Sequence, residues 1–226
     1  MLNKLFEQFD RLIFLDVETS GLNPKHDEII ELGAVSVCQN EGVPFTDKKI
    51  SMLVRLSEGK RLSPEITELT GITQSELDEK GVSKSEICSA LIDLFDNGHP
   101  LVVAYNAQFD LCFLYYLLDS FGKAKVLKNI KMLDALTVYK DRRDYPHRLE
   151  NAVAEYALET KSTHRAIDDA VATYALLCAM EKECSDLEHY INLFGYNPKY
   201  GVSGPKISSV TYVPQKYNRE RKLYDL

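Results

Sequence analysis

The sequence predicts an α/β protein in which a mixed β-sheet of about five strands is flanked by helices. Three strand-like segments follow one another near the start of the chain, at 11–18, 29–37 and 49–56, which predicts an antiparallel meander. Helical segments then alternate with short apolar runs at 101–105 and 130–133. This alternation predicts further strands in the same sheet and helices packed on its faces.

Local signals set the expected elements in order. The first strand is an apolar run that stops at Ser20-Gly21, the second is rich in β-branched residues, and a turn-like stretch at 42–47 precedes the third. Ser63-Pro64 predicts the start of a short helix that ends near Gly71. Apolar residues at helical spacing predict further helices at 83–96, 107–121, 149–158 and 166–181.

The size and composition favour one domain with an attachment. The 226 residues are 45% apolar and 27% charged, enough for a substantial core. From Asn192 onward the chain is rich in glycine, proline and tyrosine, and it is basic. We therefore expect a main domain over 1–190 and a basic C-terminal arm or tail over 191–226, which is a short hairpin, an extended arm or disordered.

Several classes of protein are excluded. No apolar run approaches the roughly 20 residues of a membrane span, and the first segment is interrupted by Glu7, Asp10 and Arg11, unlike a secretory signal. Five cysteines without a CxxC pair predict free, largely buried thiols and no zinc site. These features favour a cytoplasmic protein with no membrane partner.

The net charge of −7 at first argues against a nucleic-acid partner. Carboxylates that hold divalent cations would also make a chain acidic, and the cations then supply positive charge to a phosphate. The last 36 residues reverse the acidic balance with six basic residues, at 199, 206, 216, 219, 221 and 222. Net charge alone does not settle the partner.

Two carboxylates end the first expected strand. Asp16 and Glu18 are two residues apart, so their side chains point to the same face. Carboxylates held side by side repel each other unless a cation lies between them, and oxygen ligands favour Mg²⁺ or Mn²⁺. The alternative is that both face solvent at a strand end.

Polar residues also follow the strand at 101–105 and precede the last long helix. Asn106 suits a helix N-cap, and Asp110 lies one turn further along the same helix, near the carboxyl edge of the sheet. His164 precedes Asp168 and Asp169, and a histidine beside carboxylates can accept a proton from water near neutral pH. The alternatives are a plain cap, a solvated Asp110, an exposed loop histidine, and aspartates that only offset the helix dipole.

Three segments in order, LDVETSGL, YNAQFD and HRAIDDA, resemble the DnaQ-like exonuclease family, specifically its DEDDh branch, which includes the exonuclease domain of the DNA polymerase III epsilon subunit. The resemblance covers roughly residues 10–180. It implies a ribonuclease H-like fold and a 3′→5′ exonuclease that acts on single-stranded nucleic acid. DNA is favoured over RNA as the substrate, a DNA polymerase subunit is a possible partner, and the oligomeric state is open.

The resemblance also implies roles for individual residues. Two divalent ions, Mg²⁺ or Mn²⁺, would be held by four acids, and His164 would be the general base. The family's histidine stands five residues before its last aspartate, which selects Asp169 over Asp168, whereas helix geometry alone would favour Asp168. Arg165 occupies the position of the sister branch's tyrosine. The four metal ligands are Asp16, Glu18, Asp110 and Asp169, and the residues expected to contact the terminal nucleotide are Thr19, Leu22, Asn106 and Phe109.

Weaker matches have structural alternatives. The segment 70–73, TGIT, resembles a family segment near the substrate but also reads as a helix stop. Asp134 is expected to be structural, and Phe109 to pack in the core as well as near a base. Basic residues at 140, 142, 143 and 148 would meet phosphates or solvent. The competing functions are an RNA 3′-end trimmer, a catalytically silent binding module, and an unrelated α/β protein with scattered acids.

Overall fold

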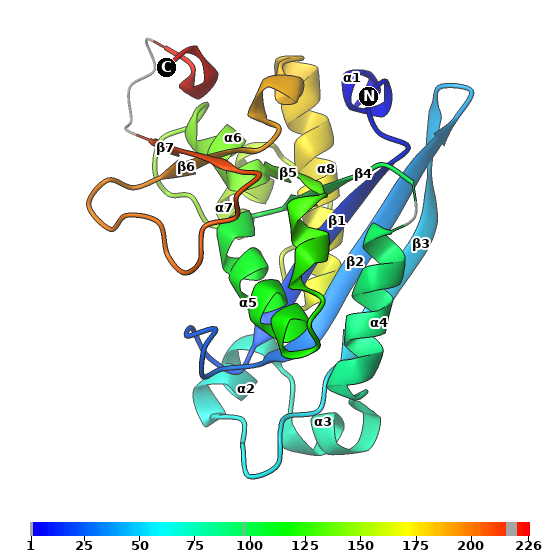
Figure 1. Cartoon of the computed structure of the whole chain (residues 1–226). Helices are drawn as coiled ribbons and strands as arrows, with labels where there is room; N and C mark the ends of the chain where they lie inside the picture. Colours follow the sequence, from blue (N-terminus) through cyan, green and yellow to red (C-terminus); the bar gives the residue numbers. More distant parts are fainter. Residues whose placement is uncertain (1, 97, 216–220) are drawn as a thin grey trace.

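The computed structural model describes residues 2–96, 98–215 and 221–226. Its main sheet has the strand order β3-β2-β1-β4-β5, in which β1, β2 and β3 are antiparallel neighbours and β4 and β5 add in parallel (Figure 1). The strands are β1 (Arg11–Thr19), β2 (Ile29–Asn40), β3 (Val43–Leu53), β4 (Pro100–Ala104) and β5 (Lys131–Asp134). The predicted mixed sheet, with its first three strands antiparallel, is confirmed.

Helices cover both faces of this sheet. In Figure 1, α8 crosses behind the sheet while α4 and α5 lie in front of it, and α2 and α3 lie at its lower end. The helices are α1 (Asn3–Phe6), α2 (Pro64–Thr70), α3 (Gln74–Lys80), α4 (Lys84–Phe95), α5 (Ala107–Ser120), α6 (Ala135–Lys140), α7 (Leu149–Glu155) and α8 (Ala166–Glu183), with short 3-10 turns at Ala124–Lys128, Leu187–Tyr190 and Leu223–Asp225.

Strand β1 divides the core by alternation. Ile13, Leu15 and Val17 belong to the cluster that includes α4 and α5, whereas Leu12 and Phe14 belong to the cluster that includes α8. Because side chains alternate along a strand, Asp16 and Glu18 continue the series that faces α8. The apolar residues of β1 therefore fix which layer the two carboxylates face.

The first turn of α8 lies directly on β2. Gly33 pairs with Asp16, and a Cβ atom at Gly33 would lie 2.1 Å from the carbonyl carbon of Ala166. Glu31, which is 0% exposed, accepts hydrogen bonds from Nε and Nη2 of Arg165 and from the backbone N–H of Ala166. Since residues opposed on antiparallel strands share a face, this contact places the start of α8 beside Asp16 and Glu18.

Some predicted boundaries were wrong. The stretch at 42–47 is not a turn, because β3 already begins at Val43, and the reversal is made by Glu41 and Gly42 with φ angles of 49° and 81°. Two residues with positive φ suit the twist of a hairpin, so a tight turn suffices where the sequence reads as a longer loop. The short helices α3 and α6 were not predicted, since neither has a long apolar stripe.

The C-terminal segment forms a second, small sheet of two parallel strands, β6 (Leu193–Tyr196) and β7 (Thr211–Pro214). Asn192 joins it to β5, accepting from Met132 N–H and donating to the Met132 carbonyl. Phe194, Ile207 and Val210 enter the core. The boundary near residue 190 stays a prediction, and the basic positions 216 and 219 lie outside the described residues.

The cysteine prediction holds in part. All five cysteines are free, but Cys184 is exposed, and Cys38 and Cys178 are only partly buried. Within the described ranges, the structure has no helix with the length and apolar character needed to cross a bilayer.

We predict that Gly33→Ala destabilises the protein by about 1–3 kcal/mol, because the added methyl group would meet the backbone of α8. The free energy of unfolding from urea titration measures this effect. Ser36→Ala is the control, because Ser36 is buried on the same strand. Among the residues that the structure describes, its hydroxyl has no hydrogen-bond partner, so its loss should change stability little. Equal stabilities for the Gly33 variant and the parent would refute the close approach.

Candidate active site

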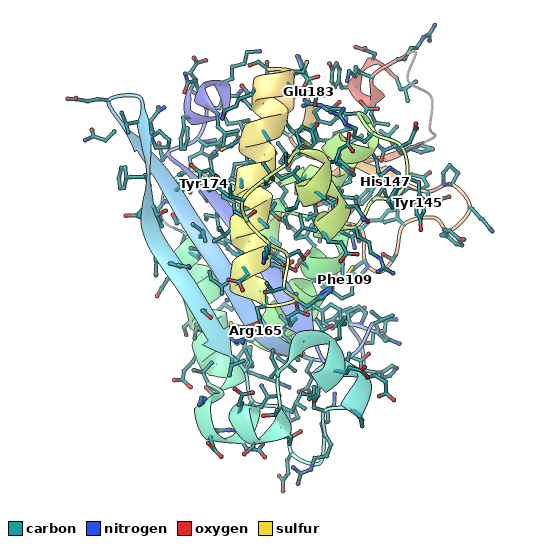
Figure 2. The ribbon with its side chains drawn as sticks, turned by 180° about the vertical axis from the view of Figure 1, so that it is seen from behind. Phe109, Tyr145, His147, Arg165, Tyr174 and Glu183 are labelled. Atoms are coloured by element: carbon teal, nitrogen blue, oxygen red, sulfur yellow. The ribbon has the colours of Figure 1, made fainter. Side chains whose placement is uncertain are left out.

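A pocket of about 360 Å³ opens where β1 ends, between α5 and the start of α8. All four predicted acids and the predicted histidine line it, together with two of the four residues expected to contact nucleotide: Asp16, Glu18, Asp110, Asp169, His164, Asn106 and Phe109. In Figure 2, Phe109 of α5 and Arg165, which directly precedes α8, both lie near the lower end of α8. Residues from three separate segments of the sequence therefore converge on one pocket.

The pocket's inner wall is fixed by a contact between α5 and β1. Oδ1 of Asp110 accepts a hydrogen bond of 3.0 Å from the backbone N–H of Val17. Val17 stands between Asp16 and Glu18, so this bond holds the Asp110 carboxylate next to both. Asp110 is buried, which argues against the alternative of a solvated helix residue.

The loop before α8 supplies the histidine. His164 has a φ of 55° and lies two residues before the helix begins at Ala166. Its ring therefore lies off the helix, and the helical spacing that favours Asp168 does not apply. Asp169 is buried in the pocket, where it accepts a 3.1 Å hydrogen bond from Thr163 N–H. Asp168 is exposed and accepts from the Thr163 hydroxyl.

The acids are strongly perturbed by burial and by one another. Burial, followed by the nearby Asp169 carboxylate, raises the pKa of Glu18 to about 8. Burial, with Asp110 and Glu18 close by, raises the pKa of Asp16 well above its usual range. Burial also raises the pKa of Asp110 and, to a smaller extent, of Asp169, although hydrogen bonds from backbone N–H groups oppose the shift at both. The pocket therefore holds four carboxyl groups that are costly to ionise together.

The donor set fits divalent cations. Glu18, His164 and Asp169 each offer one ligand atom, and these atoms lie within 4.8 Å of one another. Two carboxylates and an imidazole in this arrangement can hold a divalent metal ion. Arg165, the cation next to His164 in sequence, pairs with Glu31 instead of with the pocket acids. A divalent ion is therefore the natural partner for the crowded carboxylates.

The remaining predicted substrate residues fall in two groups. Asn106 and Phe109 line the pocket, and Phe109 also packs against Phe113 with ring centroids 5.0 Å apart. Thr19 and Leu22 do not line it: the Thr19 hydroxyl donates to the Gly21 carbonyl, and Leu22 is 83% exposed. Leu22 stands on the loop after β1.

The predicted N-cap position of Asn106 at the start of α5 is confirmed, but its side chain does not make the capping hydrogen bond. The residue has a φ of 69°. Asp134 caps α5 instead, since its Oδ1 accepts hydrogen bonds from the N–H groups of Asn106 and Ala107. The same oxygen accepts from the N–H of Leu136 at the start of α6. The structural role expected for Asp134 is therefore confirmed, and the Asn106 side chain is left exposed at the pocket.

The weaker sequence matches are mostly structural. Arg142 is buried and bonds the Met180 carbonyl and Asp186, and Arg143 pairs with Glu155 and Glu183. In the TGIT segment, Gly71 ends α2 with a φ of 72°, and Thr73 forms a capping box with Glu76. Of the basic stretch, Arg148 alone lines the pocket.

Sequence reasoning missed several pocket residues. Tyr105, His147 and Glu150 also line it, and the Tyr105 hydroxyl donates to the His147 carbonyl. These residues border expected elements, but nothing in their spacing marks them as part of a site.

Comparisons with known proteins agree with this geometry. A family model described as Exonuclease matches residues 13–177. DNA polymerase III PolC-type of Bacillus subtilis (strain 168) is 33% identical over 189 residues, which cover 81% of this chain and 12% of the relative. The same protein of Halalkalibacterium halodurans is 35% identical over 77% of this chain and 12% of its own length. The chain thus spans about 12% of these curated relatives.

Solved structures share the fold at lower identity. The E. coli ExoI–ssDNA complex with bound zinc has a TM-score of 0.67 and 21% identity, over 81% of this chain and 43% of that chain. The nuclease domain of 3′hExo, a DEDDh family member bound to rAMP, has a TM-score of 0.65 and 18% identity, over 80% of this chain and 96% of that chain.

The sheet topology is that of a ribonuclease H-like fold, which the chain shares with these solved structures. The matching family model makes the chain a nuclease, a class of hydrolases. Within that class the chain belongs to the exonuclease family, as the match over 13–177 shows, and a DEDDh family member shares its fold.

We predict that the metal-free protein loses thermal stability as the pH rises from about 5 to about 8. The pKa of Glu18 is raised, so its contribution to stability is full below the ordinary value of 4.5 and is lost as the pH rises through about 8. The raised pKa values of the other three acids act in the same sense. Differential scanning fluorimetry should show a fall in Tm of several degrees.

Millimolar Mn²⁺ or Mg²⁺ should restore Tm most at the higher pH, because binding requires ionised carboxylates. Asp16→Asn is the control: it removes one of the crowded charges, so its metal-free Tm at about pH 8 should exceed that of the parent and respond little to metal. A parent Tm that rises with pH in chelator would contradict the electrostatic account.

Proposed function

We propose that this domain is a metal-dependent 3′→5′ exonuclease that removes nucleoside 5′-monophosphates from the end of single-stranded DNA. One observation carries the proposal: four carboxylates and a histidine, brought from β1, α5 and the loop and first turn of α8, line one pocket. The grouping of Glu18, His164 and Asp169, whose ligand atoms lie within 4.8 Å of one another, supports it, because such a group can hold a divalent cation. So does family membership.

Bound divalent ions would supply positive charge to the scissile phosphate and lower the pKa of the attacking water. Asp16, Glu18, Asp110 and Asp169 would hold two such ions. The bond from Val17 N–H fixes the Asp110 carboxylate before substrate arrives. The Glu31–Arg165 pair holds the start of α8, and with it Asp169, in register with Asp16.

His164 would remove the proton from the attacking water. Its place on a loop, beside Asp169 but off the helix, lets the imidazole face the pocket while its neighbour Arg165 bonds elsewhere. The water attacks the phosphorus of the last phosphodiester bond. It attacks opposite the 3′-oxygen of the preceding nucleotide, which leaves and becomes the new 3′-hydroxyl end. Phe109 and Asn106 would contact the terminal nucleotide, Phe109 through its ring face. Thr19 and Leu22, at and just after the end of β1, stay predicted contacts of the terminal nucleotide.

DNA is the favoured substrate because the two curated relatives described above are DNA polymerases and the ExoI neighbour is bound to single-stranded DNA. The 3′hExo neighbour, bound to rAMP, makes an RNA 3′-end trimmer the second candidate. The four acids would serve either substrate, since discrimination between DNA and RNA depends on contacts to the 2′-position of the sugar. A catalytically silent binding module is disfavoured because all five chemical groups are in place.

By the same reasoning, a DNA polymerase subunit is the partner we propose, and cytoplasmic location is expected for a protein with free thiols.

We predict that chelator abolishes release of mononucleotides from 3′-labelled single-stranded oligomers and that Mg²⁺ or Mn²⁺ restores it. Asp16→Ala should remove activity while the circular dichroism spectrum is kept. Matched DNA and RNA oligomers in this assay decide between the two substrates. Metal-independent cleavage, or full activity in the Asp16 variant, would exclude the proposed site.

His164→Ala should lower kcat by roughly 10²–10⁴-fold, the usual contribution of a general base. Asp168→Ala, which changes an exposed neighbour outside the pocket, is the matched control and should stay close to the parent. A change below about twofold in the His164 variant would assign the proton acceptor elsewhere.

A further inference from the structure

A second pocket, of about 120 Å³, adjoins the active site on the side of the C-terminal segment. It lies between the start of α5, the end of α6 and the connection from β6 to β7. Asn106 and Leu136 line both pockets. The two pockets are therefore adjacent, and the second extends away from the proposed metal ligands.

The outer wall of this second pocket is held firmly against α5. Gln108 Nε2 donates to the carbonyls of Ser203, at 2.7 Å, and Pro205, at 3.0 Å, while its Oε1 accepts from the Tyr212 hydroxyl. Gly204 packs so closely on Cys112 that a Cβ atom there would lie 2.3 Å from Sγ. The β6–β7 connection is thus built into the fold next to the active site.

Three lysines stand in the pocket or on the β6–β7 connection beside it, although the chain as a whole is acidic. Lys140 lines the pocket, and Lys199 and Lys206 stand on the β6–β7 connection. Within residues 2–96, 98–215 and 221–226, none of these three lysines forms a salt bridge with a carboxylate. The lining acid, Asp134, is already saturated by three N–H donors and the Thr137 hydroxyl. The positive charges are therefore available to an anionic ligand.

An aromatic face accompanies the lysines. Tyr200 is 75% exposed and stands between the lining residues Asn197 and Gly201 in the chain, with Lys199 Nζ 5.3 Å from its ring centroid. Basic side chains interleaved with exposed aromatic rings are the usual means of binding a single strand, through phosphates and stacked bases.

We infer that this second pocket binds the nucleotides immediately 5′ of the scissile bond: Lys140 and Lys199 contact their phosphates, and Tyr200 stacks on a base. The inference rests on the proposed function, because it needs the terminal nucleotide to occupy the acid pocket. It goes beyond that function by assigning the C-terminal segment, which lies after the last residue matched by the family model, to substrate binding.

Two substrates separate this upstream site from the catalytic one. A single-stranded oligonucleotide presents upstream phosphates, whereas thymidine 5′-monophosphate p-nitrophenyl ester carries nitrophenol in place of the upstream nucleotide. In both substrates the bond that breaks is on the phosphorus attached to the 5′-oxygen of the terminal nucleoside. A contact upstream of the scissile bond affects the first substrate only.

The test is steady-state kinetics of Lys140→Ala/Lys199→Ala on both substrates. The matched control is Lys48→Ala/Lys49→Ala, which removes two exposed lysines from β3, at the opposite edge of the sheet from β5. We expect KM for the oligonucleotide to rise about 5–10-fold, with a shallower salt dependence, because two phosphate contacts are lost. kcat for the oligonucleotide, both constants for the ester, and the control variant should stay close to the parent.

A second pair tests the stacking contact: Tyr200→Ala should raise KM for the oligonucleotide, and Tyr200→Phe should retain the parental value. An unchanged KM in the lysine variant, or an equal loss on both substrates, would overturn the upstream site while leaving the proposed function standing. If the parent protein cleaves neither substrate, the proposed function fails and the upstream site fails with it.

Discussion

The pocket depends on the close packing of the first turn of α8 on strand β2. Gly33 leaves no side chain between them, and the buried Glu31 carboxylate bonds both Arg165 and the first N–H of the helix. A buried carboxylate without these donors would carry a large desolvation cost, so the pairing strongly favours one position for α8. That position sets Asp169 beside the carboxylates of β1.

The same packing creates an electrostatic cost that the metal-free fold must bear. Burial and mutual repulsion make the four pocket acids hard to ionise together, as the raised pKa of Glu18 illustrates. Groups held in this way destabilise the folded state near neutral pH and become favourable when cations arrive. The arrangement therefore exchanges stability for a preformed ligand set, which limits the rearrangement needed when substrate binds.

Much of the site could be predicted because its signals are local. The apolar run of β1 fixed the alternation that turns Asp16 and Glu18 to one face, and the order of three short motifs resembled a known family. The selection of Asp169 over Asp168 came from that resemblance, and the structure shows the physical reason: His164 lies on a loop with positive φ.

What could not be predicted depends on contacts between distant segments. Asp134 caps α5 from the neighbouring strand, so the sequence around Asn106 suggested a cap that its side chain does not make. Gly33 and Glu31 read as ordinary strand residues until α8 is placed on them. The C-terminal segment reads as loosely structured because its glycines and prolines hide two short parallel strands, whose pairing spans residues 193–214.

The central claim is that four carboxylates converge to hold divalent cations. Anomalous diffraction from crystals grown with Mn²⁺ and a nucleoside 5′-monophosphate tests it most directly. The account predicts two manganese peaks inside the pocket, both in contact with Asp16, with the phosphate of the nucleotide beside them. Manganese bound elsewhere on the surface, with the pocket acids free of it, would contradict the account.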